Sequence, residues 1–267
     1  MDLTGERRIS NPSRRAVGRT VAVCGDRTTL VKEIAPAPDL NETEKPAFRS
    51  GETESMLLSL AKIVEQRDNH TAGHCERLAF TAVALGVAMR LDSGNLLALY
   101  LGGYLHDLGK VGIPDSILFK RGRLSNREWE TMRTHPARGE EICRPLRSLR
   151  SVLPLIRHHH ERLDGTGYPD GLRGNAVPLL ARVLQVVDIY DALTNPRPYK
   201  NAYARPKALQ ILEEEADRGW RDREVTQLFV RLNQQVHSRI AAYRPGPGDG
   251  AVSMSRSLAN LQRYLEQ

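Results

Sequence analysis

Residues 158–169 of the chain are His158-His159-His160-Glu161-Arg162-Leu163-Asp164-Gly165-Thr166-Gly167-Tyr168-Pro169. Three imidazoles and two carboxylates stand here beside glycines and a proline, a density of ligand-type side chains for which a structural core has no use. Neutral imidazole together with carboxylate suits divalent iron or manganese, whereas structural zinc sites more often recruit thiolates. The stretch contains no cysteine. It therefore indicates metal chemistry.

A second cluster of ligand-type residues ends an apolar run: Tyr104-Leu105-His106-Asp107-Leu108-Gly109-Lys110. Adjacent residues on a helix point about 100° apart, so His106 and Asp107 are placed to hold neighbouring metals rather than to chelate one. Such a pair is a weak signal alone. It becomes strong beside His135 and beside Asp188, which lies in an apolar stretch where an unpaired carboxylate is costly. Asp191, one turn later, is expected to support the ligands from behind.

These motifs together resemble those of an HD-GYP domain, a branch of the HD phosphohydrolase superfamily. The resemblance runs from about residue 52 to about residue 233, with the motifs in the family's order. They are Thr71-Ala72-Gly73-His74-Cys75-Glu76-Arg77, His106-Asp107-Leu108-Gly109-Lys110, His135, the 158–169 stretch, Val187-Asp188-Ile189-Tyr190-Asp191-Ala192-Leu193-Thr194 and Arg197-Pro198-Tyr199-Lys200. The resemblance implies an all-α fold, an HD-domain helical bundle with a GYP loop at residues 167–169.

A metal shell is the next implication of the resemblance. Its expected ligands are His74, His106, Asp107, His135, His159, His160 and Asp188, with Asp107 bridging two metals. Taken alone, His74 would more often be a polar residue at the edge of a helix, and His135 a loop residue before a proline. His70 is an alternative ligand for a third metal. His158 is expected behind the ligands or at the surface, and Glu161 either orients an imidazole or holds a structural hydrogen bond.

Two metals held in this way, iron or manganese, activate a bridging hydroxide for in-line attack on a phosphodiester. Lys110 is expected to steady the phosphate or the hydroxide, although a cation at the end of a helix also compensates the helix dipole. Arg197 and Lys200 are expected to grip phosphate oxygens away from the scissile bond. Tyr168 is expected to stack on a guanine or to hydrogen-bond with it.

The substrate follows from the resemblance alone. HD-GYP enzymes hydrolyse cyclic di-GMP to pGpG and often onward to GMP, and nothing in the composition or the spacing identifies guanine. One alternative is an HD hydrolase that acts on another cyclic dinucleotide or nucleotide. Another is a non-catalytic module that senses cyclic di-GMP or docks a signalling partner through the Tyr168 loop. The presence of every expected ligand and of Lys110 favours an enzyme.

Composition sets broad limits on the class of protein. The 267 residues carry a net charge of +7, which suits an anionic partner and gives no specific indication of nucleic acid or membrane binding. Three separated cysteines, Cys24, Cys75 and Cys143, predict no disulfide framework and a reducing compartment. No signal peptide or apolar run long enough to span a bilayer is evident, so a cytoplasmic protein is expected.

The chain divides into three expected parts. Residues 1–50 are polar and predict a flexible leader, or the remnant of an upstream regulatory region. Residues 51–243 form the phosphohydrolase domain, which includes predicted helices near 52–66, 70–89, 93–107, 125–134, 136–143, 148–162, 178–194, 206–216 and 222–242. The periodicity of the first helix places Met56, Leu57, Leu60, Ile63 and Val64 on its apolar face. Asp92 or Ser93 is expected to cap the third helix, and Ser125-Asn126-Arg127-Glu128 is an expected capping box at the start of the fourth. Residues 244–267 form a linker and a short tail. Leucines in the tail suggest a segment for homodimerisation, but so short a helix is marginal alone.

Overall fold

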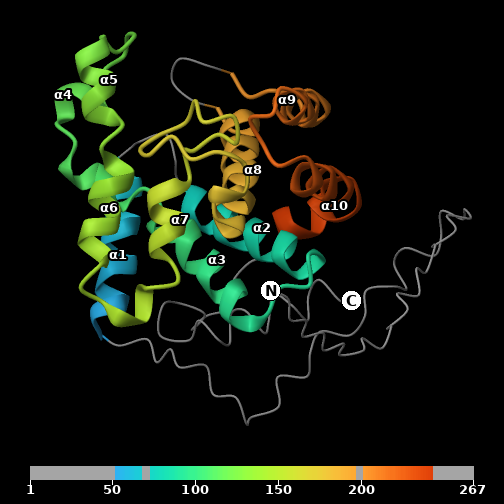
Figure 1. Cartoon of the computed structure of the whole chain (residues 1–267), viewed down its shortest axis with the longest axis horizontal. Helices are drawn as coiled ribbons and strands as arrows, with labels where there is room; N and C mark the ends of the chain where they lie inside the picture. The colour runs from blue at the N-terminus through green and yellow to red at the C-terminus, as the bar shows by residue number, and fades with distance from the viewer. Residues whose placement is uncertain (1–51, 68–72, 197–200, 243–267) are drawn as a thin grey trace, which may run out of the picture. The chain divides into compact units, whose positions relative to one another are not determined.

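The computed structural model describes residues 52–67, 73–196 and 201–242, and this part of the chain is helical apart from one isolated bridge between Asp164 and Arg173 (Figure 1). The all-α expectation is confirmed. The elements, in chain order, are α1 (Glu52–Arg67), α2 (His74–Ala88), α3 (Ser93–Leu105), the 3₁₀ turn η1 (Leu108–Gly112), α4 (Asp115–Leu118), α5 (Asn126–Met132), α6 (His135–Cys143), η2 (Arg147–Leu149), α7 (Leu153–His158), η3 (Gly174–Ala176), α8 (Leu179–Thr194), α9 (Arg205–Asp217) and α10 (Arg223–Ala242). The predicted leader and tail lie outside the described residues.

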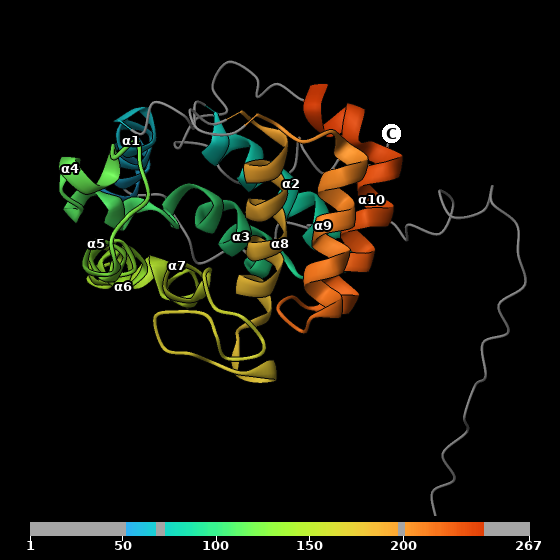
Figure 2. The ribbon, with the colours of Figure 1, turned by 90° about the horizontal axis from the view of Figure 1, so that it is seen from above.

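The core is aliphatic and centres on α2, α3 and α8, whose leucines, valines and alanines are largely buried. In both ribbon views α8 lies between α7 on one side and the α9–α10 pair on the other (Figures 1 and 2). Gly103 lets α2 and α3 approach closely, because a Cβ there would lie only 2.5 Å from the Cα of Ala79. The core thus fixes the positions of the three helices that supply the first, second and last metal-binding motifs.

Helix starts follow local capping chemistry, as the sequence predicts. Asp92 caps α3 by accepting a hydrogen bond from the backbone N–H of Asn95 at 2.8 Å. Ser125 and Glu128 form a capping box at the start of α5. Both expectations are confirmed, and each satisfies backbone donors that the first turn of a helix leaves without partners.

The predicted helix over residues 148–162 is wrong. A 3₁₀ turn and the short helix α7 replace it, and α7 ends at His158, so His160 and Glu161 lie beyond the helix. Pro154 belongs in the first turn of α7, where its missing N–H costs nothing. After the helix the chain folds back on itself: a Cβ on Gly167 would collide with the backbone of Glu161. The helix therefore ends at His158, and the three consecutive histidines do not project from one continuous helix.

The apolar face of α1 also differs from expectation. Leu58, Ala61 and Val64 are buried, whereas Met56 and Ile63, which the periodicity places in the core, are 70% and 58% exposed. None of the described helices is both long enough and apolar enough to cross a membrane.

Candidate metal centre

The predicted ligands come from five separate segments that meet at one place. His74 begins α2, His106 and Asp107 follow α3, His135 begins α6, His159 and His160 follow α7, and Asp188 lies in α8. Two groups of ligand atoms form, each with all its atoms within 4.8 Å of one another, and Asp107 belongs to both: Asp107 with His135, His159 and His160, and Asp107 with His74 and His106. Asp188 lies beside the second group, with its Oδ1 3.5 Å from Nε2 of His74.

Asp107 faces the two groups with different oxygens. Its Oδ1 lies 3.2 Å from Nε2 of His135 and 3.9 Å from Nε2 of His159. Its Oδ2 lies 3.3 Å from Nε2 of His106. A carboxylate that bridges two metals needs this arrangement, with one oxygen directed to each site. Gly109 makes it possible, because the His135 carbonyl oxygen leaves no room for a Cβ at that position.

Three of the histidines are oriented by the same device. Nδ1 of His106, His135 and His159 lies 3.1, 2.9 and 2.7 Å from the carbonyl oxygen of the residue three positions earlier. A carbonyl can only accept a hydrogen bond, so each Nδ1 carries a proton and Nε2 is the ring nitrogen that remains for a metal. Metal-bound histidines are held in this way by the partner of their other ring nitrogen. The local backbone thus fixes the ring nitrogen that each histidine offers to a metal.

The Nε2 atoms of these three histidines are placed to bind a cation rather than one another. Nε2 of His106 is buried and has no hydrogen-bond partner among the described residues. Nε2 of His135 lies 3.3 Å from Nε2 of His159, and two lone pairs at this distance repel unless a positive charge lies between them. A divalent metal removes both costs, so the residues present fit a metal site.

Burial keeps two of the histidines in the neutral form that metal binding requires. Burial, followed by the neighbouring imidazoles, lowers the pKa of His159 and of His160 well below its ordinary value, so both rings are neutral. Burial acts to raise the pKa of Asp107, but the Lys110 ammonium and His106 outweigh it and hold that pKa well below its usual range. Burial also acts to lower the pKa of His106, but the Asp107 carboxylate outweighs it and raises that pKa above its ordinary value. The centre therefore places the neutral rings of His159 and His160 beside an ionised Asp107.

Lys110 lies against this carboxylate, with its Nζ 2.7 Å from Oδ2 of Asp107. The predicted position near the ligands is observed, and the ammonium is directed toward the carboxylate oxygen that faces His106. Compensation of a helix dipole does not explain this side chain, because its charge lies at the metal centre.

Asp191 and its hydrogen-bond partners hold the His74 ring through its Nδ1 atom. Nδ1 of His74 lies 2.7 Å from Oδ2 of Asp191. The same carboxylate accepts hydrogen bonds from Nε and Nη2 of Arg77 at 2.7 and 3.0 Å and from Nδ2 of Asn195 at 3.0 Å. Burial acts to raise the pKa of Asp191, but His74 and Arg77 outweigh it and lower that pKa to about 2. The supporting position expected for Asp191 is thus occupied, with His74 as the ligand that it orients.

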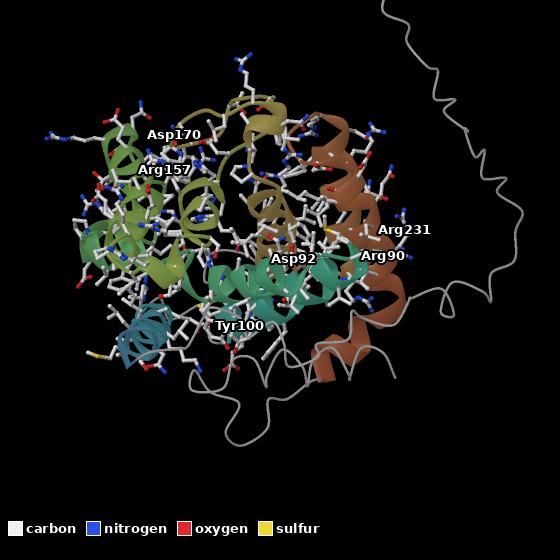
Figure 3. All side chains as sticks on the ribbon, turned by 60° about the horizontal axis from the view of Figure 1, so that its bottom comes forward. Arg90, Asp92, Tyr100, Arg157, Asp170 and Arg231 are labelled. Atoms are coloured by element: carbon white, nitrogen blue, oxygen red, sulfur yellow. The ribbon has the colours of Figure 1, made fainter. Side chains whose placement is uncertain are left out.

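The loop after α7 lies over the centre and is fixed at both ends. Both carboxylate oxygens of the fully buried Glu161 accept backbone hydrogen bonds, from Asp170 at 2.7 Å and Leu172 at 3.1 Å. Arg157 and Asp170, both labelled in Figure 3, form a two-point ion pair at 2.7 and 2.8 Å. Of the two roles expected for Glu161, the structure shows the structural hydrogen bonds.

The tip of this loop reaches the ligands through Tyr168. Its ring stacks on the His160 ring with a centroid separation of 4.8 Å and an angle of 30°. The tyrosine therefore lies at the boundary of the metal centre. Its expected contact with a nucleobase stays a prediction.

Comparison with known proteins agrees with this geometry. A model of the HD domain matches residues 59–225, more than half of the chain. The chain belongs to the HD domain family. The resemblance to its HD-GYP branch is confirmed by curated relatives at 30–39% identity, several of them cyclic di-GMP phosphodiesterases.

Two relatives illustrate the range of activities near this HD domain. A 3'3'-cGAMP-specific phosphodiesterase 3 of Vibrio cholerae is 37% identical over 60% of this chain and 35% of its own length. The cyclic di-GMP phosphodiesterase response regulator RpfG of Xanthomonas campestris is 39% identical over 65% of this chain and 45% of its own length. The chain thus spans less than half the length of either relative.

Solved structures support the fold. A cyclic GMP-AMP specific phosphodiesterase from V. cholerae aligns with a TM-score of 0.56 at 19% identity, over 78% of this chain and 53% of that one. The HD domain of the phosphodiesterase PgpH from Listeria monocytogenes, in complex with cyclic di-AMP, aligns with a TM-score of 0.51 at 14% identity, over 72% and 100% of the two chains. At these identities the likeness concerns the helical bundle alone.

The remaining predicted residues of the HD domain fall into two sets. Arg197, Lys200 and His70 lie outside the described residues. His158, Glu161 and Asp170 form a further group of possible ligands, but the oxygens of both carboxylates already accept hydrogen bonds. We therefore assign that group to the support of the loop.

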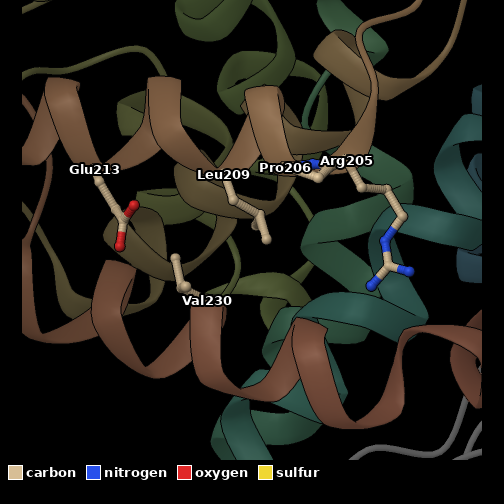
Figure 4. A pocket seen from close by; sticks show the side chains of 5 residues that line it. All are labelled: Arg205, Pro206, Leu209, Glu213 and Val230. Carbon is tan, nitrogen blue, oxygen red and sulfur yellow. The ribbon is translucent and has the colours of Figure 1, made fainter.

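A separate groove of the HD domain lies between α9 and α10 (Figure 4). Arg205, Pro206, Leu209, Glu213 and Val230 line it, and none of these is a predicted ligand. Arg205 is engaged with the backbone and side chain of Asn233. The groove offers no cluster of titratable groups, so the candidate functional site is the metal centre.

Proposed function

We propose that this chain is a metal-dependent phosphodiesterase that hydrolyses cyclic di-GMP to pGpG, and onward to GMP. The position of Asp107 carries the proposal: this ionised carboxylate directs one oxygen to each of two groups of buried histidines. A site built in this way suits two divalent metals, and iron or manganese matches imidazole and carboxylate ligands. The seven predicted ligands and the domain boundaries 51–243 belong to the same proposal.

Metals held here supply Lewis acidity and an activated water for attack on phosphorus. The chain contributes the remaining functions. Lys110 is 19% exposed and lies beside Asp107, within reach of a phosphate at the same place, where its charge would stabilise the phosphoryl oxygens. Tyr168 offers a ring at the rim, and Arg197 and Lys200 are proposed to hold the distal phosphate by charge-assisted hydrogen bonds.

A second candidate substrate is 3'3'-cGAMP. Relatives that carry this specificity in their names are 31–37% identical to this chain, and those named for cyclic di-GMP are 30–39% identical. Identity at this level does not separate the two. We favour cyclic di-GMP because the chain shares the HD-GYP motif set, which the family resemblance associates with that nucleotide. A non-catalytic sensor is disfavoured, because such a module has no need of a complete ligand set.

The test measures hydrolysis of cyclic di-GMP and 3'3'-cGAMP by the protein loaded with Mn²⁺ or Fe²⁺, together with its metal content. We expect turnover of cyclic di-GMP, and we expect Asp107→Ala to remove turnover and most of the bound metal. Asp217→Ala is the matched control, because this carboxylate is 67% exposed and its one ion-pair partner in the part of the chain that the structure describes is the surface residue Arg223. Full activity in Asp107→Ala would refute the proposed centre. If the protein hydrolysed 3'3'-cGAMP but not cyclic di-GMP, 3'3'-cGAMP would be its substrate instead.

A further inference from the structure

Three side chains continue outward from the metal centre without taking part in it. Tyr168 stacks on His160, and the guanidinium of Arg133 lies 5.4 Å from the centroid of the Tyr168 ring. The same guanidinium lies 5.9 Å from the centroid of the Trp129 ring. Trp129 and Arg133 are four residues apart and lie in and just after α5, so they share one face of this short helix. We call these residues, Trp129, Arg133 and Tyr168, the outer cluster.

The Arg133 guanidinium keeps its hydrogen-bonding capacity for a ligand. Within residues 73–196 and 201–233 its recorded side-chain contacts are the two aromatic rings, and no carboxylate in that part of the chain pairs with it. Other arginines near the centre form ion pairs with carboxylates: Arg77 pairs with Asp191, and Arg157 pairs with Asp170. An arginine held by its flat face against rings presents its N–H edge outward.

Packing does not explain the outer cluster. None of the residues of α5 is buried, so the helix contributes no side chain to the core. Trp129 is 45% exposed, and a large aromatic surface left in water does not gain the free energy that its burial would release. The chain's other tryptophan, Trp220, is partly buried and lies between the guanidinium groups of Arg162 and Arg218.

We propose that the outer cluster is a guanine subsite, in which Arg133 donates two hydrogen bonds to O6 and N7 of a base that packs beside Trp129. This inference rests on the proposed function, because it requires a cyclic dinucleotide at the metal centre. A guanidinium fork matches the two acceptors on that edge of guanine. Adenine presents an amino donor in place of O6, so the same fork meets one acceptor and one donor. Exposed aromatic rings add stacking that every base can use.

A phosphate contact is the competing role for Arg133, and the choice of nucleotide separates the two. Cyclic di-GMP and cyclic di-IMP share O6 and N7, whereas cyclic di-AMP has the same phosphates and lacks O6. Affinities are measured by competition against a fluorescent cyclic di-GMP on the metal-loaded protein at low temperature. Binding, not turnover, is the readout, so the result does not depend on whether the protein hydrolyses these nucleotides.

Arg133→Ala should weaken the binding of cyclic di-GMP and of cyclic di-IMP by about tenfold or more, and should change that of cyclic di-AMP by less than about twofold. Arg127→Ala is the matched control, because Arg127 is an exposed arginine of the same helix that makes no contact with Tyr168 among the described residues. It should leave all three affinities unchanged. An equal loss for the three nucleotides, or no loss for any of them, would overturn the guanine subsite.

Tryptophan fluorescence gives a second, independent readout. In a Trp220→Phe background Trp129 is the remaining tryptophan, and a base that packs beside it should quench its emission as cyclic di-GMP is added. Arg133→Ala should shift that titration to higher nucleotide concentration. Unchanged emission at saturating cyclic di-GMP would exclude a base beside Trp129. If the protein bound the nucleotide with these signatures but released no product, the proposed function would fail while the subsite stood.

Discussion

Asp191 orients the imidazole ring of His74, which is a proposed metal ligand. It holds Nδ1 of His74 at 2.7 Å and is itself fixed by Arg77, so the ring is oriented before any metal arrives. In Asp191→Asn an NH₂ group replaces one carboxylate oxygen. If the remaining oxygen accepts the hydrogen bond from His74, the NH₂ group faces the Arg77 guanidinium, and two hydrogen-bond donors then oppose each other. We expect metal affinity to fall about 10- to 100-fold, measured by titration with Mn²⁺.

A matched carboxylate separates this effect from a general loss of stability. Asp222 also pairs with an arginine, Arg182, at 3.0 Å, and it caps the start of α10, but it does not contact any predicted ligand. Asp222→Asn should lower the free energy of unfolding and leave metal affinity unchanged. Equal metal affinities in wild type and Asp191→Asn would show that the hydrogen bond to His74 has no influence on the centre.

At this scale the sequence predicts much of the site. Residue type and motif order predicted the side chains that the structure brings together, and the spacing of one helical turn from Asp188 predicted the position of Asp191 behind His74. The sequence did not reveal that Arg77 completes the support, because the partners lie 114 positions apart. The outer cluster was missed for a related reason: the spacing of Trp129 and Arg133 is visible in the sequence, but their contact with Tyr168 depends on the fold.

The loop after α7 is an element whose shape depends on one buried carboxylate. Glu161 accepts two backbone hydrogen bonds from the far side of the loop and is fully buried. Glu161→Gln keeps the volume but turns an NH₂ group toward a backbone N–H. We expect a loss of about 1–3 kcal/mol in the free energy of unfolding, measured with urea, together with weaker nucleotide binding through a displaced Tyr168.

Metal content distinguishes loop support from ligand chemistry in this variant. Glu161 lies outside both groups of ligand atoms that contain Asp107, so Glu161→Gln should retain its metals. Glu130→Gln, an exposed glutamate on α5, is the control and should behave as wild type. A variant with wild-type stability and nucleotide affinity would contradict the anchoring role.

Periodicity predicts helices better than it predicts where they end or which face they bury. The capped starts of α3 and α5 were predicted because capping is local chemistry. The length of α7 was not, since its end depends on a loop that folds back against Glu161. For α1, the periodic pattern included Met56 and Ile63, which the structure leaves exposed. Burial depends on which neighbours are present, and the pattern within one helix does not contain that information.

Across the molecule, the centre exists because five segments distant in sequence converge on one place. No pattern in a single sequence measures that convergence, so the expectation of a shared centre came from the family resemblance. The structure supplies the missing distances, with Asp107 between the two groups of histidines. The substrate is the part that neither the pattern nor the distances determine.

Acid stability is a property of the whole domain that the ion pairs predict. The hydrogen bonds from Arg157 lower the pKa of Asp170 below its ordinary value of 3.8. A lowered native pKa means that the unfolded chain binds more protons in this range, so the pair stabilises the fold above about pH 4 and loses its effect as pH falls through the native pKa. The stability advantage of wild type over Asp170→Asn should therefore be larger at about pH 6 than at about pH 3.

Urea unfolding of both proteins at the two pH values measures this difference directly. Asp217→Asn is the control, because Asp217 and its partner Arg223 are each more than 60% exposed, and an exposed pair contributes little. An advantage of the same size at both pH values would mean that the Arg157–Asp170 pair does not contribute through its ionisation.

The central claim is that two divalent metals bind on either side of Asp107. Its most direct test is an anomalous difference map from crystals grown with Mn²⁺. The account predicts two peaks about 3.5–4 Å apart, with the Asp107 carboxylate between them, one beside His135, His159 and His160 and the other beside His74, His106 and Asp188. A map with no peak among these side chains, or with its peaks elsewhere in the molecule, would contradict the account.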